Sequence, residues 1–263
     1  MNLVSLPQPN YSFVFLDHTT SATPSAMKPA PVFQKIIDAL LEQINGPYAA
    51  SHGAVTANFR VGSGPEDRAP GEIAVNFRDT IPEAPDALAY HRTTNGVPDI
   101  EIGVDLFSSL TEGSESMSGG VSHEILELCG DAGANEWADL QDVSGQTRAR
   151  ENCDAVQNTG YEASNGVWVS NFVLPSYYIP QAPGPWDALG VMTSQTDVSH
   201  GYEIRATAPT DISQVQGLVQ GHVAFGEHVH HGKRVFAIGT LTAQQKKRKS
   251  HPYCRTHRRG VRL

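Results

Sequence analysis

The chain has 263 residues, with 19 Lys and Arg against 28 Asp and Glu, and a formal net charge of −9. This length is sufficient for a domain with a substantial core. Its apolar residues form no run near the roughly 20 that a membrane helix needs, so a membrane-spanning protein is excluded. The N-terminal sequence MNLVSLP has no basic start and no apolar block. We therefore expect no cleavable signal peptide and synthesis in the cytoplasm.

The charge is divided unevenly along the chain. Residues 246–263 hold eight basic residues and no acid, so residues 1–245 have 11 basic and 28 acidic residues, a charge of −17. The basic tail is expected to be disordered alone, and it could bind nucleic acid or an acidic protein with strong salt dependence. The alternative is a solubilising tail without a specific partner. Its cations are Lys246, Lys247, Arg248, Lys249, Arg255, Arg258, Arg259 and Arg262.

Apolar periodicity and turn residues predict the elements in chain order. A strand is expected at 11–16, a helix from Val32 to Ile44 that begins near Pro31 and stops at Asn45-Gly46-Pro47, and then strands at 55–61, 72–77 and 99–106. A helix containing His123 follows, and residues 130–166 are polar and turn-rich. Further strands are expected at 167–174 and 202–206, with a terminal hairpin of 223–225 and 234–241. This order favours an α+β fold with a mixed sheet over a doubly wound parallel one.

The segment Ser122–Asp131 is the most informative part of the sequence. On a helix, the ionisable residues share an arc of roughly 100°, opposite the apolar side chains. His123 and Glu127 are four residues apart, so both can reach one ion. The residues of this arc are His123, Glu124, Glu127 and Asp131.

This spacing is that of the zinc-hydrolase motif H-E-x-x-H, with glutamate in place of the second histidine. His123 and Glu127 would bind a metal, and Glu124 would act as general base on water that the metal activates. A carboxylate is a competent zinc ligand, although an added anionic ligand favours harder ions such as Mn²⁺ or Ca²⁺. The alternative is an ordinary solvated face of an amphipathic helix.

Further acids downstream could complete such a site. Glu151 and Asp154 follow the helix by a few tens of residues, as third ligands do in several zinc hydrolases. Asp131 and His91 are competing candidates for a metal-binding or supporting role. We also expect the strand at 99–104 to expose an edge, which could pair with an extended peptide.

Several blocks together resemble a family of zincin-like proteins found in bacteriophages, prophages and bacteria. The resemblance spans most of residues 30–220, and parts of the tail are similar to the ends of some members. It implies a zincin-like fold, in which a twisted mixed β-sheet has a backing helix and an active-site helix that carries H-E-x-x-E. It also implies that Glu151 is the third zinc ligand, supported by Asp154. The blocks are Ala87–His91, Gly96–Pro98, Ser122–Glu127, Glu151–Asp154 and Gly166–Pro175.

Two functions are compatible with this resemblance. The first is a zinc-dependent peptidase or amidase acting on a peptide or protein, with a tyrosine to stabilise the oxyanion. The second is an inactive zincin-fold structural or interaction protein of a phage particle, which would be virion-associated and use the basic tail to bind its partner. The predicted units are a zincin-like domain at 1–220, a hairpin extension at 221–245 and the tail at 246–263. The candidate oxyanion donors are Tyr90, Tyr161 and Tyr177.

Overall fold

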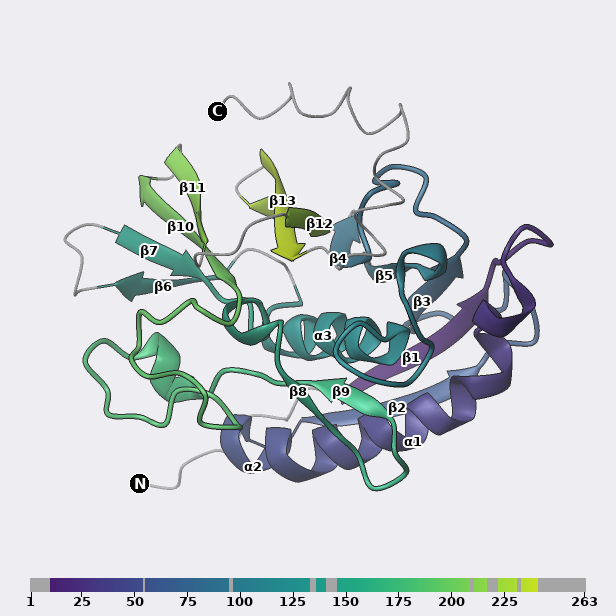
Figure 1. Cartoon of the computed structure of the whole chain (residues 1–263), viewed down its shortest axis with the longest axis horizontal. Coiled ribbons are helices and arrows are strands. Elements are labelled where there is room, and N and C mark those ends of the chain that lie inside the picture. The colour runs from purple at the N-terminus through teal and green to yellow at the C-terminus, as the bar shows by residue number, and fades with distance from the viewer. Residues whose placement is uncertain are drawn as a thin grey trace.

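The structure is a computed structural model of the whole chain (Figure 1). It describes residues 10–53, 55–94, 97–132, 136–140, 146–208, 211–216, 222–230 and 233–240. The predicted basic tail lies outside these ranges. No helix among the described residues is both long enough and apolar enough to cross a membrane.

A five-stranded mixed sheet forms the centre of the molecule, in the order β2-β1-β3-β5-β4. Four of its strands are parallel, and β4 runs antiparallel to β5 at one edge. The expected α+β architecture with a mixed sheet is therefore confirmed. The strands are β1 (Asn10–Asp17), β2 (Thr56–Val61), β3 (Ile73–Arg78), β4 (Ala89–Thr94) and β5 (Val97–Gly103).

Two predictions about this sheet are wrong. No strand was expected at β4, because its sequence AYHRTT mixes apolar and polar residues without a clear alternation. The strand at 99–104 was expected to expose an edge, but β5 lies between β3 and β4. The edge position belongs to β4, which pairs with β5 in the register His91 to Ile100.

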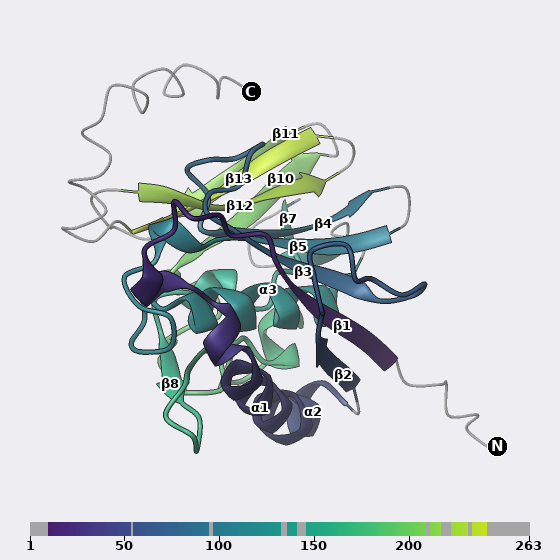
Figure 2. The same ribbon diagram turned by 90° about the vertical axis from the view of Figure 1, so that its right-hand side faces the viewer.

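Helices cover one face of the sheet (Figure 2). Alternation along β1 sends Phe13 and Phe15 into the core shared with α1 (Phe33–Gln43) and α3 (Met117–Gly130). Val14 and Leu16 point the other way, into a separate small cluster. The rings of Phe15 and Phe33 meet edge to face at 5.4 Å, so an aromatic contact joins α1 to β1.

The α-helix α1 ends at Gln43, next to the stop that Asn45-Gly46-Pro47 predicts. An irregular π-helical turn at Ile44–Tyr48 then leads into the short α2 (Ala49–His52). Gly46 takes a non-helical conformation within this turn, as its missing side chain permits. Tyr48 is 1% exposed, and its burial holds the continued segment against the core.

The second half of the chain adds smaller elements. The stretch 130–166 was expected to be irregular, but it contains three short strands that are defined by pairing rather than by apolar periodicity. A four-stranded antiparallel sheet has the order β11-β10-β7-β6, while β8 pairs with β9 and β12 with β13. The hairpin predicted near the C-terminus is confirmed, and its strand β12 contacts β4. The strands are β6 (Trp137–Leu140), β7 (Gln146–Ala149), β8 (Gly160–Glu162), β9 (Trp168–Ser170), β10 (Tyr202–Ala208), β11 (Asp211–Gln216), β12 (His222–His230) and β13 (Lys233–Thr240). Short 3-10 turns lie at Ser25–Met27, Ala30–Val32, Val104–Leu106, Asp154–Val156 and Pro175–Tyr178.

A closed ring of three buried hydrogen bonds joins α1, α3 and β9. The Ser122 hydroxyl donates to Gln43 Oε1 at 2.7 Å, and the Gln43 amide donates to the Ser170 carbonyl at 2.7 Å. The Ser170 amide N–H donates back to the Ser122 hydroxyl at 3.0 Å. Because each polar group is satisfied inside the core, the ring fixes the rotation of α3 about its own axis. That rotation decides where the next residue, His123, points.

His52 gives the fold a testable pH dependence. Its ring stacks on Tyr48 at 4.2 Å, and burial lowers the pKa of His52 to about 4 despite a hydrogen bond with the Tyr48 backbone. Because the folded pKa lies below the unfolded value, the unfolded chain takes up a proton that the folded chain refuses as the pH falls from about 6.5 to 4. Folding stability is lost in this window.

We therefore expect His52→Gln to lose less stability than the parent on acidification. Between pH 7.5 and 4.5, the free energy of unfolding should fall by roughly 2.5 kcal/mol less in the variant. Urea denaturation of both proteins at the two pH values measures this difference. Any effect of the substitution on stability that is the same at both pH values cancels when the two pH values are compared. An equal loss in the two proteins would show that His52 does not titrate in this way.

Candidate metal centre

Helix α3 brings the residues of the predicted motif into the interior. Ser116 caps its first turn by accepting a hydrogen bond from the Gly119 N–H, and twelve of its fourteen residues are buried. His123, Glu124 and Glu127 are 5%, 1% and 0% exposed. The alternative of a solvated helix face is therefore wrong, because the polar arc faces other protein groups.

Strand β4 contributes His91 to the same place. Successive side chains of a strand point to opposite faces, so His91 and Tyr90 diverge. His91 is fully buried, and its Nδ1 lies 3.1 Å from Glu124 Oε2. The Tyr90 hydroxyl instead accepts a hydrogen bond from Arg92 at 3.1 Å, which places this candidate oxyanion donor on the other face of the sheet.

The segment after β7 is held against α3 by Asn152. Its amide nitrogen donates to the Leu126 carbonyl at 3.2 Å and to the Tyr48 hydroxyl at 2.9 Å. The next residue, Cys153, donates its backbone N–H to Glu127 Oε1 at 3.3 Å. This attachment brings Glu151 and Asp154, the residues on either side of Asn152–Cys153, close to α3.

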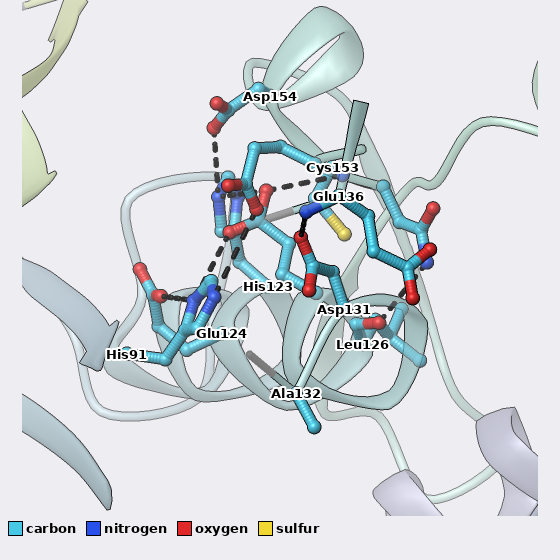
Figure 3. A network of polar contacts seen from close by, with 12 residues as sticks. His91, His123, Glu124, Leu126, Asp131, Ala132, Glu136, Cys153 and Asp154 are labelled. Carbon is cyan, nitrogen blue, oxygen red and sulfur yellow. Dashed lines mark hydrogen bonds and ion pairs between the residues drawn. The ribbon is translucent and has the colours of Figure 1, made fainter. Parts of the chain in front are cut away.

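Two histidines and four carboxylates thus converge in one buried cluster, part of which is seen in Figure 3. His123 Nε2 lies 3.1 Å from Glu127 Oε1 and 3.3 Å from Asp154 Oδ1. His91 Nδ1 lies 3.7 Å from Glu127 Oε2, and His91 Nε2 lies 3.9 Å from Glu151 Oε2. Glu127 therefore directs one oxygen to each histidine. The members are His91, His123, Glu124, Glu127, Glu151 and Asp154, each at most 5% exposed.

The spacing of these donor atoms suits a small cation. Ligands about 2.0 Å from a tetrahedral metal are separated by about 3.3 Å, close to the separations from His123 Nε2 to Glu127 Oε1 and to Asp154 Oδ1. The Cys153 thiol is also near enough to share an ion with His123 and Glu127. Among the described residues, Glu127 Oε2 and Asp154 Oδ2 are buried oxygens without a hydrogen-bond partner. Buried oxygens without a partner require an explanation, and a bound cation is one that fits oxygens of two neighbouring carboxylates.

The cluster perturbs its own protonation. Burial and the charge of Asp154 raise the pKa of the Glu127 carboxyl well above its usual value. Burial alone would lower the pKa of His91, but its hydrogen bond with Glu124 and the charges of Glu151 and Glu127 raise it to about 10. The pKa of His123 is likewise raised, because the charge of Glu127 and hydrogen bonds with Asp154 and Glu127 outweigh burial. Protons thus neutralise part of the negative charge that a cation would otherwise balance.

The remaining predicted site residues lie elsewhere. Asp131 caps the C-terminal end of α3 and accepts the Glu136 N–H at 2.6 Å. Tyr161 lies in β8 near Glu42 and Gln43, and burial raises its pKa to about 12. The Tyr177 hydroxyl donates to Glu203 at 3.0 Å, while the Arg148 guanidinium lies over its ring. None of these contacts brings a predicted oxyanion donor to the cluster.

Sequence reasoning missed two groups that support the cluster. The Tyr202 hydroxyl donates to Asp154 Oδ1 at 2.5 Å, and the Tyr178 hydroxyl donates to Asn152 Oδ1 at 3.1 Å. Both tyrosines come from segments without a motif, so only the tertiary fold identifies their role. Cys129 and Cys153 are free buried thiols.

No protein-family model, curated protein or solved structure matches the chain.

The position of Asp154 depends on the close approach of Gly201. A Cβ atom at residue 201 would lie only 1.9 Å from the Asp154 carbonyl oxygen and 2.7 Å from the Ala155 carbonyl carbon. Since both contacts are with backbone, Gly201→Ala should destabilise the protein by about 2 kcal/mol. Gly64→Ala is the matched control, because a Cβ there meets nothing within 4 Å. Chemical denaturation of both variants measures the difference, and equal stability would contradict the tight approach.

Proposed function

We propose that this chain is a metal-dependent hydrolase of zincin type, acting as a peptidase or amidase. The observation that carries the proposal is the convergence of His123, Glu124 and Glu127 with a third acid from a distant segment in one buried cluster. His123 Nε2 and Glu127 Oε1 would hold the ion together with the Cys153 thiol, which is near enough to share it, and Asp154 Oδ1 lies 3.3 Å from His123 Nε2. The sequence-based choice of third ligand was Glu151, whose carboxylate lies 3.9 Å from His91.

The arrangement of β4 over α3 supports the zincin comparison. β4 is the antiparallel edge strand of the mixed sheet and contacts α3 directly. β4 also lies against β12 of the C-terminal hairpin. The H-E-x-x-E spacing, close to that of zinc metalloproteases, favours a polypeptide substrate over a small molecule.

The residues of the cluster have distinct roles in the proposed reaction. A divalent cation, when bound, would polarise a scissile carbonyl and lower the pKa of a water molecule. Glu124 lies one residue after His123 and shares the buried space, so its carboxylate can accept the proton of that water and return it to the leaving nitrogen. His91 orients Glu124 through the 3.1 Å contact at Nδ1. Tyr202 orients Asp154 from behind.

The metal content of the purified protein tests the first part of the proposal. Protein prepared without a chelator should contain about one divalent ion per chain, and His123→Ala should contain less than about 0.2. His18→Ala is the control, because His18 contacts Asn76 of β3 and not the cluster. Elemental analysis gives both values. A parent protein with less than about 0.2 ion per chain would remove the enzymatic proposal.

Glu124→Gln tests the second part. The amide keeps the shape of the side chain but cannot accept the proton, so hydrolysis of a peptide library should fall by about 10²- to 10⁴-fold while metal content is unchanged. Glu115→Gln, at an exposed position just before α3, should behave as the parent. Equal hydrolysis by Glu124→Gln and the parent, or none by the parent, would leave the inactive structural protein as the function to pursue.

A further inference from the structure

We infer that the cluster has a second cation position, formed by His91 Nδ1, Glu124 Oε2 and Glu127 Oε2. This inference rests on the proposed metal centre and extends it. Ligand atoms of His91, Glu124 and Glu127 lie close enough together to contact one ion, as do those of His123, Glu127 and Cys153. The two groups share Glu127 and otherwise have different ligands. The ligands of the second group come from β4 and α3, so the second position is built from regular elements.

The orientation of Glu127 provides the first argument. Its Oε1 lies 3.1 Å from His123 Nε2, and its Oε2 lies 3.7 Å from His91 Nδ1. A carboxylate with one oxygen directed to each of two histidines can bridge two ions, which in two-metal sites lie about 3.5–4 Å apart. Oε2 is buried and has no hydrogen-bond partner among the described residues, so it is available for this role.

The charge of the cluster provides the second argument. Four carboxylates lie within it, each at most 3% exposed. One divalent cation with neutral histidines would leave two negative charges buried, and buried charge without compensation is strongly unfavourable. Two divalent cations would balance all four carboxylates. Glu151, 3.9 Å from His91 Nε2, would then be the outer carboxylate that orients a metal-binding imidazole.

Occupancy of the second position has a consequence for the proposed reaction. The second ion would bind the same Glu124 oxygen that contacts His91, and the charge of the ion would make the Glu124 carboxylate a weaker base. Repulsion from the first ion weakens binding of the second. The first ion therefore supports hydrolysis, and the second, bound only at higher concentration, suppresses it.

Titration of the metal-free full chain with Zn²⁺ tests this inference. Native mass spectrometry should show two bound ions in the parent, with the second at least about tenfold weaker than the first. X-ray absorption of the two-ion form should show metal–metal scattering at about 3.5–4 Å. This signal separates a bridged pair from an ion bound by histidines outside the cluster.

His91→Gln should retain the first ion and lose both the second ion and the metal–metal signal. His18→Gln is the control with the same change of residue, and it should keep both. If His91→Gln does not fold, as judged by circular dichroism, the metal–metal signal of the parent decides the question alone. A parent with one ion, or with two ions and no metal–metal signal, overturns the second position but leaves the proposed function standing. A parent that binds no ion overturns both.

Discussion

Burial of four carboxylates in one small volume is the constraint on which the rest of this structure depends. Each unpaired buried charge is unfavourable by several kcal/mol, so the cluster requires compensation by protons or by cations. Without a cation, the raised pKa values of His91, His123 and Glu127 supply protons. A fold that keeps such a group in its interior surrounds it with rigid elements, because small displacements would remove the few interactions that balance the charge.

The positioning of the cluster relies on polar contacts between segments far apart in the sequence. Asn152 joins the segment after β7 to α3 and to Tyr48 of the irregular turn after α1. Gln43 of α1 sets the rotation of α3 through Ser122. The α-helix α1 ends next to the predicted stop at Asn45-Gly46-Pro47, and the irregular turn that follows provides one of the Asn152 contacts through Tyr48. The sequence predicted the end of the helix but not this turn, so this part of the support for the site was not predicted.

Local patterns in the sequence were enough to predict much of the fold and part of the site. The alternation of β1, the periodicity of α1 and the i, i+4 spacing of His123 and Glu127 are local properties, and all three predictions are consistent with the structure. The strand β4 was missed because Tyr90 and His91 are both buried although they face opposite sides, which removes the polar and apolar alternation. The proximity of Tyr202 to Asp154 depends on chain segments 48 residues apart, and no local pattern encodes such a contact.

The glutamate at position 127 also has a physical rationale in this structure. A histidine there would present one nitrogen to an ion beside His123 and would add no negative charge. The carboxylate accepts the Cys153 N–H and faces His123 with Oε1, while Oε2 faces His91. One side chain therefore links the helix, the edge strand and the downstream segment. Glutamate at position 127 therefore suits a cluster in which two histidines lie on opposite sides of this residue. A histidine at position 127 would not present a negatively charged oxygen to each of them.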